Sequence, residues 1–351
     1  MRLVGGFLDK SSFLDAGRKL MPEIEKIFRK RFRVLQAIEM YGPIGRRALA
    51  EQLQWTEREV RNETDVLSEQ QLIVIGQKGM ICSAQGDSIL EQLKALFQEI
   101  SGITVKEQQL AKLFNIERVI IIPGNVEEDA SIKNVLGKEG AKIITQHARE
   151  KCNIAVTGGN SVAAIGDFLS PTSPLNSACF IAARGGMGDE MSFQANTVVA
   201  KFAQACNATY RTLFLPEHLS EQAYQAMKSE PMIQEMMTLY EEIDIVVHGI
   251  GAAQEMAIRR NSSPEEQQLL EEKGAVGEAF GYYFNEVGEI VHHIRTIGIQ
   301  LEQVKKAQHI IAIAAGINKA TAIQAYFKNA APQTTFITDE RTANEIIAKI
   351  K

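Results

Sequence analysis

The sequence predicts an N-terminal winged helix-turn-helix followed by a doubly wound, mostly parallel α/β domain. Two observations carry this prediction. Residues 22–83 contain, in order, a long helical stretch, two short ones and an alternating stretch typical of a hairpin. From residue 116 onward, short apolar runs alternate with helical segments, as strands and crossover helices do in a parallel sheet. We therefore expect a DNA-binding domain at 1–86, a helical linker at 87–115 and a ligand-binding domain at 116–351.

The composition is that of a soluble globular protein, with 45% hydrophobic and 23% charged residues among 351. No apolar run approaches the roughly 18 to 20 residues that span a bilayer, and the first residues lack the apolar centre of a secretory signal. We therefore expect a cytoplasmic protein with no membrane partner. The four cysteines form no CxxC pair, so we expect them to be reduced and predict no metal site. They are Cys82, Cys152, Cys179 and Cys206.

The charge is unevenly distributed along the chain. The net charge is −5, yet residues 1–86 hold 14 lysines and arginines against 11 acidic residues, while the remainder holds 24 against 32. The front segment is therefore the natural place for a polyanionic partner such as DNA.

The front segment has the order of a winged helix-turn-helix. Residues 22–41 carry apolar side chains at helical spacing with a basic side that includes Arg29, Lys30, Arg31 and Arg33. Residues 44–53 predict a short second helix, and a capping box from Thr56 to Glu59 begins the third. Residues 72–83 alternate around two glycines and predict the hairpin that forms the wing.

In this arrangement the helix after the capping box enters the major groove of double-stranded DNA. Its early polar residues are the candidates for contacts with bases and phosphates, and Lys78 at the hairpin tip would contact the DNA backbone. These helix residues are Thr56, Glu57, Arg58, Arg61 and Asn62. The alternative is a small protein-protein module with a solvated charged face. The order of helices, capping box and hairpin favours DNA.

The linker carries an apolar stripe at intervals of four, three and four residues, which is typical of a short coiled-coil seam. Its members are Ile89, Leu93, Leu96 and Ile100. The stripe predicts a homo-oligomer, dimer or tetramer. The alternative is a helix that packs on its own domain.

Seven apolar runs predict the strands of the parallel sheet: RVIIIPG, NIAVTGG, ACFIAARGG, TYRTLFLP, DIVVHGIG, HIIAIAAG and TTFITDE. Several end in glycine, so the loops at the carboxyl edge of the sheet can approach a ligand closely, where doubly wound folds bind their ligands. Between the fifth and sixth runs, FGYYFNEVGEIVHH predicts an inserted hairpin.

The turn after the second strand is the first candidate binding site. Gly158 and Gly159 let the backbone bend, Asn160 or Ser161 can cap the next helix, and the N–H groups of such a helix start suit a phosphate or carboxylate. A plain strand-to-helix connection is the alternative.

Three more strand ends offer groups suited to a phosphorylated sugar. One carries Arg184, Gly185 and Gly186, with Gln194 on the following helix; another leads to Arg259 and Arg260. The last places Lys319 in the first turn of a helix, where it opposes the helix dipole. A bound anion explains such a lysine better than helix stability does, and a solvated surface lysine is the alternative.

Taken in order, the front winged helix and five motifs resemble bacterial sugar-responsive repressors of the SorC type over essentially the whole chain. The motifs are VTGGNS, ARGG, VVHGIGAA, GEAFGYYFNEVGEIV and AAGINKATAI. The resemblance implies a transcriptional repressor of glycolytic genes that binds operator DNA and whose effector is fructose 1,6-bisphosphate, with no other cofactor. It places the effector contacts on Gly159, Asn160, Ser161, Arg184, Gln194, Arg259, Glu278 and Lys319.

The chemistry of these residues suits a bisphosphate, which brings about four negative charges that arginine and lysine can clamp. We expect the turn at Gly158 to hold one phosphate while Lys319 closes on it from the neighbouring strand end. Glu278 would repel phosphates, so we assign it to sugar hydroxyls. An ion pair between Glu278 and an arginine or lysine is the alternative.

The sheet also resembles that of sugar-phosphate isomerases and glucosamine-phosphate deaminases, so a DNA-binding enzyme is the second hypothesis. Those deaminases follow their GIG-type turn with a stretch that bears a catalytic histidine. Here AAQEMAIRR follows, which leaves Glu255 as the acid-base candidate, and His248 precedes the turn on a strand, where a core histidine is usual. We therefore expect no catalytic residues.

Overall fold

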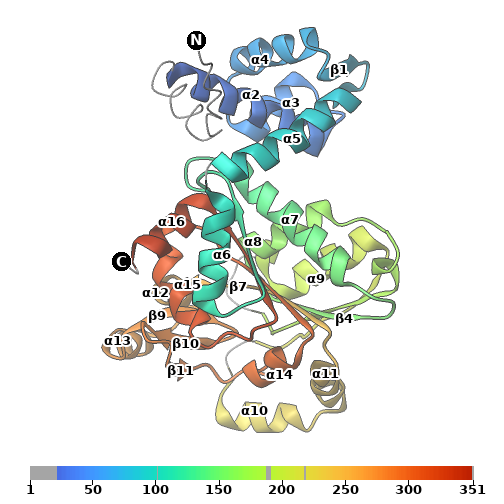
Figure 1. The fold of residues 1–351 in the computed structure, drawn as a ribbon. Helices are drawn as coiled ribbons and strands as arrows, with labels where there is room; N and C mark the ends of the chain where they lie inside the picture. Colours follow the sequence, from blue (N-terminus) through green and yellow to red (C-terminus); the bar gives the residue numbers. More distant parts are fainter. Residues whose placement is uncertain (1–21, 101, 187–190, 217–218, 350–351) are drawn as a thin grey trace, which may run out of the picture. The chain divides into compact units, whose positions relative to one another are not determined.

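The computed structural model describes residues 22–349 except 101, 187–190 and 217–218, and for 22–26, 29 and 94–100 it describes the backbone alone (Figure 1). The chain forms two compact units, Met1–Thr104 and Val105–Lys351. No helix in the described part of the chain is long and apolar enough to cross a membrane.

The first unit is the predicted winged helix-turn-helix. Leu35, Leu49, Val60 and Met80 meet in its buried core, and Met80 also exchanges backbone hydrogen bonds with Ile44 at 2.8 and 3.0 Å. Its elements are α2 Pro22–Tyr41, α3 Arg46–Leu53, α4 Glu57–Glu69, β1 Ile73–Gly76, β2 Gly79–Cys82 and α5 Ala84–Ile100. Strands β1 and β2 pair in antiparallel fashion and form the wing.

The turn into α4 follows from local chemistry. Gln54 ends α3 in a left-handed conformation with φ 55°. The Thr56 hydroxyl then accepts the Glu59 N–H at 3.2 Å, and the Glu59 carboxylate accepts the Thr56 N–H at 3.1 Å. The predicted capping box is therefore confirmed, and α4 begins at Glu57.

The predicted apolar stripe lies on α5 and is only partly described. Ile89 and Leu93 are half-buried, and Leu90 between them is fully buried in the core of the first unit. The side chains of Leu96 and Ile100 lie outside the described residues. The start of α5 thus packs on its own domain, as the alternative prediction had it.

The second unit is built on a seven-stranded parallel sheet that contains all seven predicted strands (Figure 1). Its order is β3-β13-β12-β7-β4-β5-β6, and each neighbouring pair is parallel. The strands are β3 Arg118–Ile122, β4 Asn153–Val156, β5 Cys179–Ala182, β6 Thr209–Arg211, β7 Ile245–Gly249, β12 His309–Ile313 and β13 Thr334–Asp339. After β4 the chain moves to β5 and β6 on one side, then returns to place β7 on the other side. The order of the strands therefore reverses between β4 and β7.

Helices cover both faces of this sheet. On one face α7 and α9 bury an aliphatic core, and Phe202 meets Phe180 edge-on at 5.7 Å. On the other face Phe114 of α6 stacks on Phe327 of α15 at 4.6 Å, and both rings contact Phe336. The longer helices of this unit are α6 Ile103–Phe114, α7 Ser131–His147, α9 Ala195–Cys206, α10 Glu221–Lys228, α11 Pro231–Glu241, α13 Pro264–Glu272, α15 Ala320–Phe327 and α16 Glu340–Ala348.

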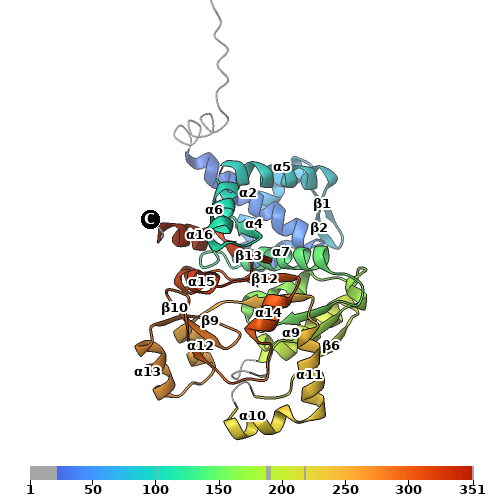
Figure 2. The same cartoon turned by 60° about the horizontal axis from the view of Figure 1, so that its bottom comes forward.

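A smaller antiparallel sheet, of order β11-β10-β9-β8, is inserted between β7 and β12. Its strands are β8 Gly251–Ala252, β9 Ala275–Ala279, β10 Tyr282–Asn285 and β11 Ile290–His293. The predicted hairpin is β10 and β11, whereas β8 and β9 were not predicted because they are short and contain glycine. Both ribbon views show β10 beside α15 (Figure 2).

Candidate functional site

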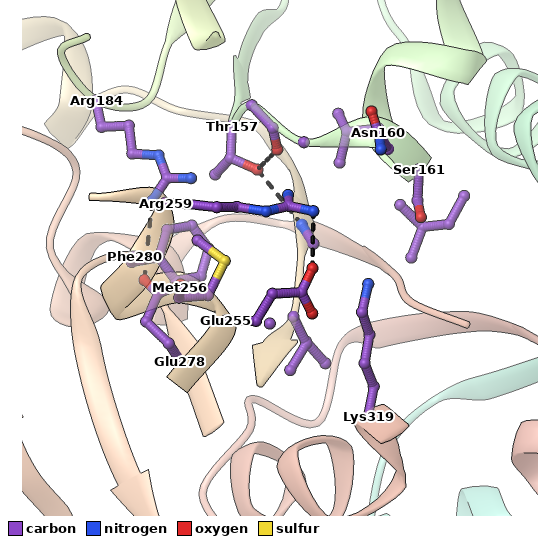
Figure 3. Close-up of a pocket in the computed structure, with 17 residues that line it drawn as sticks. Thr157, Asn160, Ser161, Arg184, Glu255, Met256, Arg259, Glu278, Phe280 and Lys319 are labelled. Carbon is purple, nitrogen blue, oxygen red and sulfur yellow. Dashed lines mark hydrogen bonds and ion pairs between the residues drawn. The ribbon is translucent and has the colours of Figure 1, made fainter. Parts of the chain in front are cut away.

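A pocket with about 670 Å³ of empty space, its mouth included, lies at the carboxyl ends of β4 and β7 (Figure 3). Because the strand order reverses between these two strands, this is the position where doubly wound sheets bind ligands. Segments that follow β4, β5, β7 and β12 all line the pocket, as does the turn between β9 and β10. The four predicted strand ends therefore converge on one site.

The turn after β4 presents backbone to the pocket. A Cβ on Gly158 would lie 2.2 Å from the Phe193 carbonyl oxygen, so only glycine fits there. Gly159 has φ 111° and ψ 153°, a region almost restricted to glycine, and a Cβ there would meet no described atom within 4 Å. The bend therefore requires glycine at both positions, and the second one faces open space.

Two details of this turn differ from the sequence prediction. Helix α8, Asn160–Ala163, is four residues long, and Gly159 caps it in place of Asn160 or Ser161. The Gly159 N–H is also occupied, because it donates to the Phe193 carbonyl at 2.8 Å. The N–H groups of Asn160 and Ser161 are in the first turn of a helix, where no intrahelical acceptor exists. These are the groups that remain for a ligand.

Lys319 reaches the same pocket from the end of β12 (Figure 3). It is the N-cap residue of α15, after the short 3-10 turn Ile317–Lys319. Burial lowers the pKa of Lys319; Arg259 and Lys133 add to this effect, and Glu255 opposes it. The prediction that Lys319 follows the strand next to the glycine turn is wrong, because β7 lies between β12 and β4. The lysine and the glycine turn therefore approach the pocket from opposite sides of β7.

Arg259 and Glu255 lie one turn apart on α12, Ala253–Arg259, and both line the pocket. The Arg259 Nη2 lies 2.7 Å from a Glu255 carboxylate oxygen, and both side chains are more than a third exposed, at 40% and 35%. Such a solvent-screened pair is weak and can open for a ligand anion.

Glu278 is paired in the structure with buried arginines. Its Oε1 lies 2.7 Å from Arg260 Nη2 and 3.8 Å from Arg184 Nη1, and it accepts the Gly281 N–H at 2.6 Å. The ion pair that sequence analysis left as the alternative is therefore present. The second carboxylate oxygen, Oε2, lies 3.8 Å from where a Cβ of Gly251 would stand, on the pocket side. Glu278 can thus accept a ligand hydroxyl while two guanidinium groups offset its charge.

Three of the predicted site residues lie beside the pocket without lining it. A Cβ on Gly185 would be 2.1 Å from the Leu215 carbonyl oxygen, and the Gly186 N–H donates to the same carbonyl at 2.9 Å. These two glycines serve close packing of the chain. The Gln194 side-chain oxygen lies 3.2 Å from where a Cβ of Gly186 would stand, so Gln194 is directed toward this segment.

Phe280 is a pocket residue that the sequence analysis missed. It is buried and has φ 56°, and with Gly281 at φ 85° it forms the two-residue turn between β9 and β10. Both residues have positive φ, as in a type I′ turn, where asparagine followed by glycine is the usual pair. In the sequence, the FG dipeptide between two stretches of alternating side chains could have indicated this turn. A bulky side chain in this conformation carries strain of the kind found at binding sites.

His248 is a core residue. Burial lowers the pKa of His248 to about 4, so the ring is neutral at physiological pH. Its Nδ1 lies 3.0 Å from the Gly249 carbonyl, which can only accept, so this nitrogen carries the proton. Nε2 then accepts from the Tyr326 hydroxyl at 3.1 Å. The ring is held with neither nitrogen available for proton transfer to a pocket ligand.

The candidate DNA-contacting residues of the first unit are all exposed, namely Thr56, Glu57, Arg58, Arg61, Asn62 and Lys78. The Thr56 hydroxyl is engaged in the capping box, whereas Arg58 and Arg61 project from the first turns of α4. The basic side of α2 packs on its own unit: Lys30 lies 3.2 Å from Glu59 and Arg31 lies 3.1 Å from Glu63.

Trp55, directly before the capping box, positions α4. The Lys30 ammonium and the Arg33 guanidinium lie 5.0 and 5.2 Å from the centre of its ring. These are cation–π distances. The residue directly before the cap of α4 is therefore fixed against α2.

Two family models match the chain. The model described as "CggR N-terminal DNA binding domain" matches residues 27–97, and the one described as "Putative sugar-binding domain" matches residues 98–348. The central glycolytic genes regulator of Priestia megaterium is 39% identical over 96% of this chain and 98% of its own length. The protein of the same name from Bacillus subtilis is 36% identical over 96% of this chain and 99% of its own length.

Solved structures agree with these matches. A protein from Enterococcus faecalis, described as belonging to the SorC family of transcriptional regulators, is 38% identical, with a TM-score of 0.65 over 69% of this chain and 99% of its own. The full-length sorbitol operon regulator SorC from Klebsiella pneumoniae shares the fold at 17% identity, with a TM-score of 0.62 over 89% of this chain and 98% of its own.

Proposed function

We propose a function for this chain from its family, because it belongs to the SorC-type family of sugar-binding transcriptional regulators, together with the central glycolytic genes regulators. The proposed function is repression of central glycolytic genes under the control of fructose 1,6-bisphosphate. The observation that carries the proposal is the convergence of three cations, Arg184, Arg259 and Lys319, on one pocket beside a glycine turn.

The charge of the pocket suits a polyanion. Two carboxylates also line it, but Glu278 is offset by Arg260 and Arg184, and Glu255 by Arg259. Lys319 then remains as an excess positive charge in the pocket, and burial, together with Arg259 and Lys133, lowers its pKa. A phosphate next to Lys319 would stabilise the charged lysine and be stabilised in return.

We assign one phosphate to the space between the turn at Gly158–Ser161 and Lys319. Neighbouring strands lie about 4.8 Å apart, so β4 and β12, with β7 between them, are about 10 Å apart. A phosphate with a lysine side chain extended toward it fills such a gap. Arg259 and Arg184 then hold the second phosphate, and Glu278 Oε2 accepts a sugar hydroxyl.

Asn160 supports a hydroxylated ligand. Its side-chain oxygen is buried and has no hydrogen-bond partner among the described residues. An unpaired buried acceptor costs about 1–3 kcal/mol, which a donor from a ligand or a water molecule would recover.

For the DNA site we propose that Arg58, Arg61 and Asn62 meet the major groove and that Lys78 on the wing meets the phosphate backbone. A regulator that reads two half-sites needs two winged domains, so we also propose a homo-oligomer, dimer or tetramer.

Calorimetry and gel-shift titration on the full chain test the two halves of the proposal. Fructose 1,6-bisphosphate should bind and should change the affinity for promoter DNA of a glycolytic operon. A thermal-shift screen of glycolytic phosphates gives an independent ranking, because a ligand at 100 times its Kd adds about 2.7 kcal/mol to the stability of the state that binds it. A screen in which a monophosphate or an uncharged sugar ranks first would contradict the assignment of the effector.

A further inference from the structure

A second cavity lies in the α/β unit and shares no lining residue with the first pocket. It holds about 610 Å³ of empty space, its mouth included, between the β10–β11 hairpin, helix α14 Leu301–Lys306 and the end of α15. Phe284, Val304 and Ala331 are buried among its walls, and Ile290 closes one side.

Side chain to backbone hydrogen bonds hold the rim of this cavity in place. Asn329 donates to the Gly288 carbonyl at 2.7 Å and so ties the hairpin tip to the end of α15. Gly288 has φ 88°, and a Cβ there would lie 2.5 Å from Lys328 Cβ, so only glycine allows this approach. On the other side Gln333 donates to the Lys305 and Ala307 carbonyls, both at 2.8 Å. The cavity is therefore preformed.

The aromatic side chains that line the cavity present apolar surface to it. Tyr326 supplies its ring, while its hydroxyl is engaged with His248 at 3.1 Å. Burial raises the pKa of Tyr326, so the phenol stays neutral. Phe284 meets this ring edge-on at 6.0 Å. A charged or highly hydroxylated molecule would lose its hydration here without replacement, which argues against a sugar phosphate in this cavity.

The rim carries a cation that has no partner. Lys305 is exposed, and no hydrogen bond or ion pair of its ammonium exists among the residues that the structure describes. The next residue, Lys306, is paired with Glu241 at 2.8 Å. Glu289, also on the rim, already accepts from Asn285 at 2.8 Å. The mouth of this apolar cavity thus carries one ammonium, Lys305, that has no partner among the described residues, and one carboxylate, Glu289, that is held by Asn285.

We propose that this cavity binds a small molecule with an aromatic or aliphatic body and a single acidic group, the body against Phe284 and Tyr326 and the acid at Lys305. The proposal is independent of the effector's identity, because it uses none of the residues of the first pocket.

Fluorescence titration of the full chain with the aromatic sulfonate 8-anilinonaphthalene-1-sulfonate tests this site. Lys305→Ala should weaken binding roughly five- to tenfold, the range of one charge-assisted contact at a partly exposed site, while Lys306→Ala on the same helix should leave it unchanged. The neutral analogue N-phenyl-1-naphthylamine should bind equally well to both variants. Ala330→Phe, which places a ring in the cavity, should remove both probes.

Circular dichroism of Ala330→Phe verifies that this variant folds, and the two exposed lysine variants keep the test decisive if it does not. Equal probe binding by the wild type and Ala330→Phe, or equal losses in Lys305→Ala and Lys306→Ala, would overturn the proposal. So would a fall in sedimentation mass upon Ala330→Phe, because the cavity would then be a contact between copies of the chain.

Discussion

The two functional regions of this protein are built in opposite ways. The surface proposed to read bases comes from residues close together at the start of one helix, which is fixed by a capping box from Thr56 to Glu59 and by Trp55 directly before it. The effector pocket gathers side chains from the ends of four parallel strands and from an inserted turn, more than 150 residues apart in the case of Ser161 and Lys319.

This difference determines what a single substitution can do. In the pocket each element supplies a different group, so one change should strongly weaken effector binding without touching the fold of the other unit. On α4 several exposed side chains share the contact, so single changes should have graded effects. The following predictions test this contrast, from the largest expected effect to the smallest.

Gly159→Val should have the largest effect. The residue occupies a φ/ψ region almost restricted to glycine and faces open space in the pocket, so valine both strains the turn and blocks the ligand. Calorimetry should show a loss of fructose 1,6-bisphosphate affinity of at least about a hundredfold, or about 2.8 kcal/mol. Operator binding without effector should persist.

Gly274→Val is the matched control. Gly274 also has positive φ, 65°, and a Cβ there would meet no described atom within 4 Å, but it lies outside the pocket. This variant should lose stability and keep effector affinity. If both glycine variants lost the effector equally, backbone strain and not the pocket would explain the result.

Lys319→Ala should weaken effector binding about ten- to a hundredfold, since a charge-assisted contact contributes about 1.5–3 kcal/mol. Lys328→Ala, at the other end of the same helix and exposed, is the control and should bind like the wild type. Both proteins should bind operator DNA, but Lys319→Ala should respond only at higher effector concentrations. Wild-type affinity in Lys319→Ala would refute the phosphate assignment.

Arg58→Ala and Arg61→Ala should each weaken operator binding by about 1–3 kcal/mol if the arginine reads a base. Gel-shift titrations with the operator and with an unrelated duplex separate the two kinds of contact. A loss confined to the operator indicates a base contact, whereas an equal loss on both sequences indicates a phosphate contact. Unchanged binding in both variants would remove α4 from the interface.

The same contrast explains which features of the protein could be predicted from the sequence. The capping box, the wing and the seven strands could be predicted because each depends on periodicity or on residues close in the chain. The convergence of four strand ends also followed, because parallel strands place their carboxyl ends on one edge. Strand order did not follow: Lys319 was expected beside the glycine turn, yet β7 separates them.

Side-chain partners across long sequence separations could not be predicted either. Nothing local to Glu278 indicates that Arg260 and Arg184 surround it. Gly185 and Gly186 look like ligand-binding glycines, but they accommodate the Leu215 carbonyl. Phe280 enters the pocket because two strands meet in a turn of positive φ, and an aromatic residue is an unusual choice for that turn.

The smallest expected effect concerns pH and the start of α4. Hydrogen bonds from the Thr56 backbone and hydroxyl, together with Lys30, lower the pKa of Glu59 to about 2. Because the folded-state pKa lies below the ordinary value of 4.5, the contribution of this carboxylate to stability is present above about pH 4.5 and is lost as the pH falls toward 2. Glu59→Gln keeps a hydrogen-bonding side chain but cannot titrate.

Trp55, the single tryptophan of the chain, lies next to this cap and reports on the first unit through its fluorescence. In urea titrations followed at this residue, the wild type should unfold at a higher midpoint than Glu59→Gln at pH 7. The gap between the two midpoints should shrink at pH 4 and narrow further at pH 3, because below about pH 4.5 the unfolded state binds a proton at Glu59 that the folded state, with a pKa of about 2, does not bind. A gap that stays constant from pH 7 to pH 3 would mean that the charge of Glu59 does not stabilise the helix, and that the cap depends on Thr56 alone.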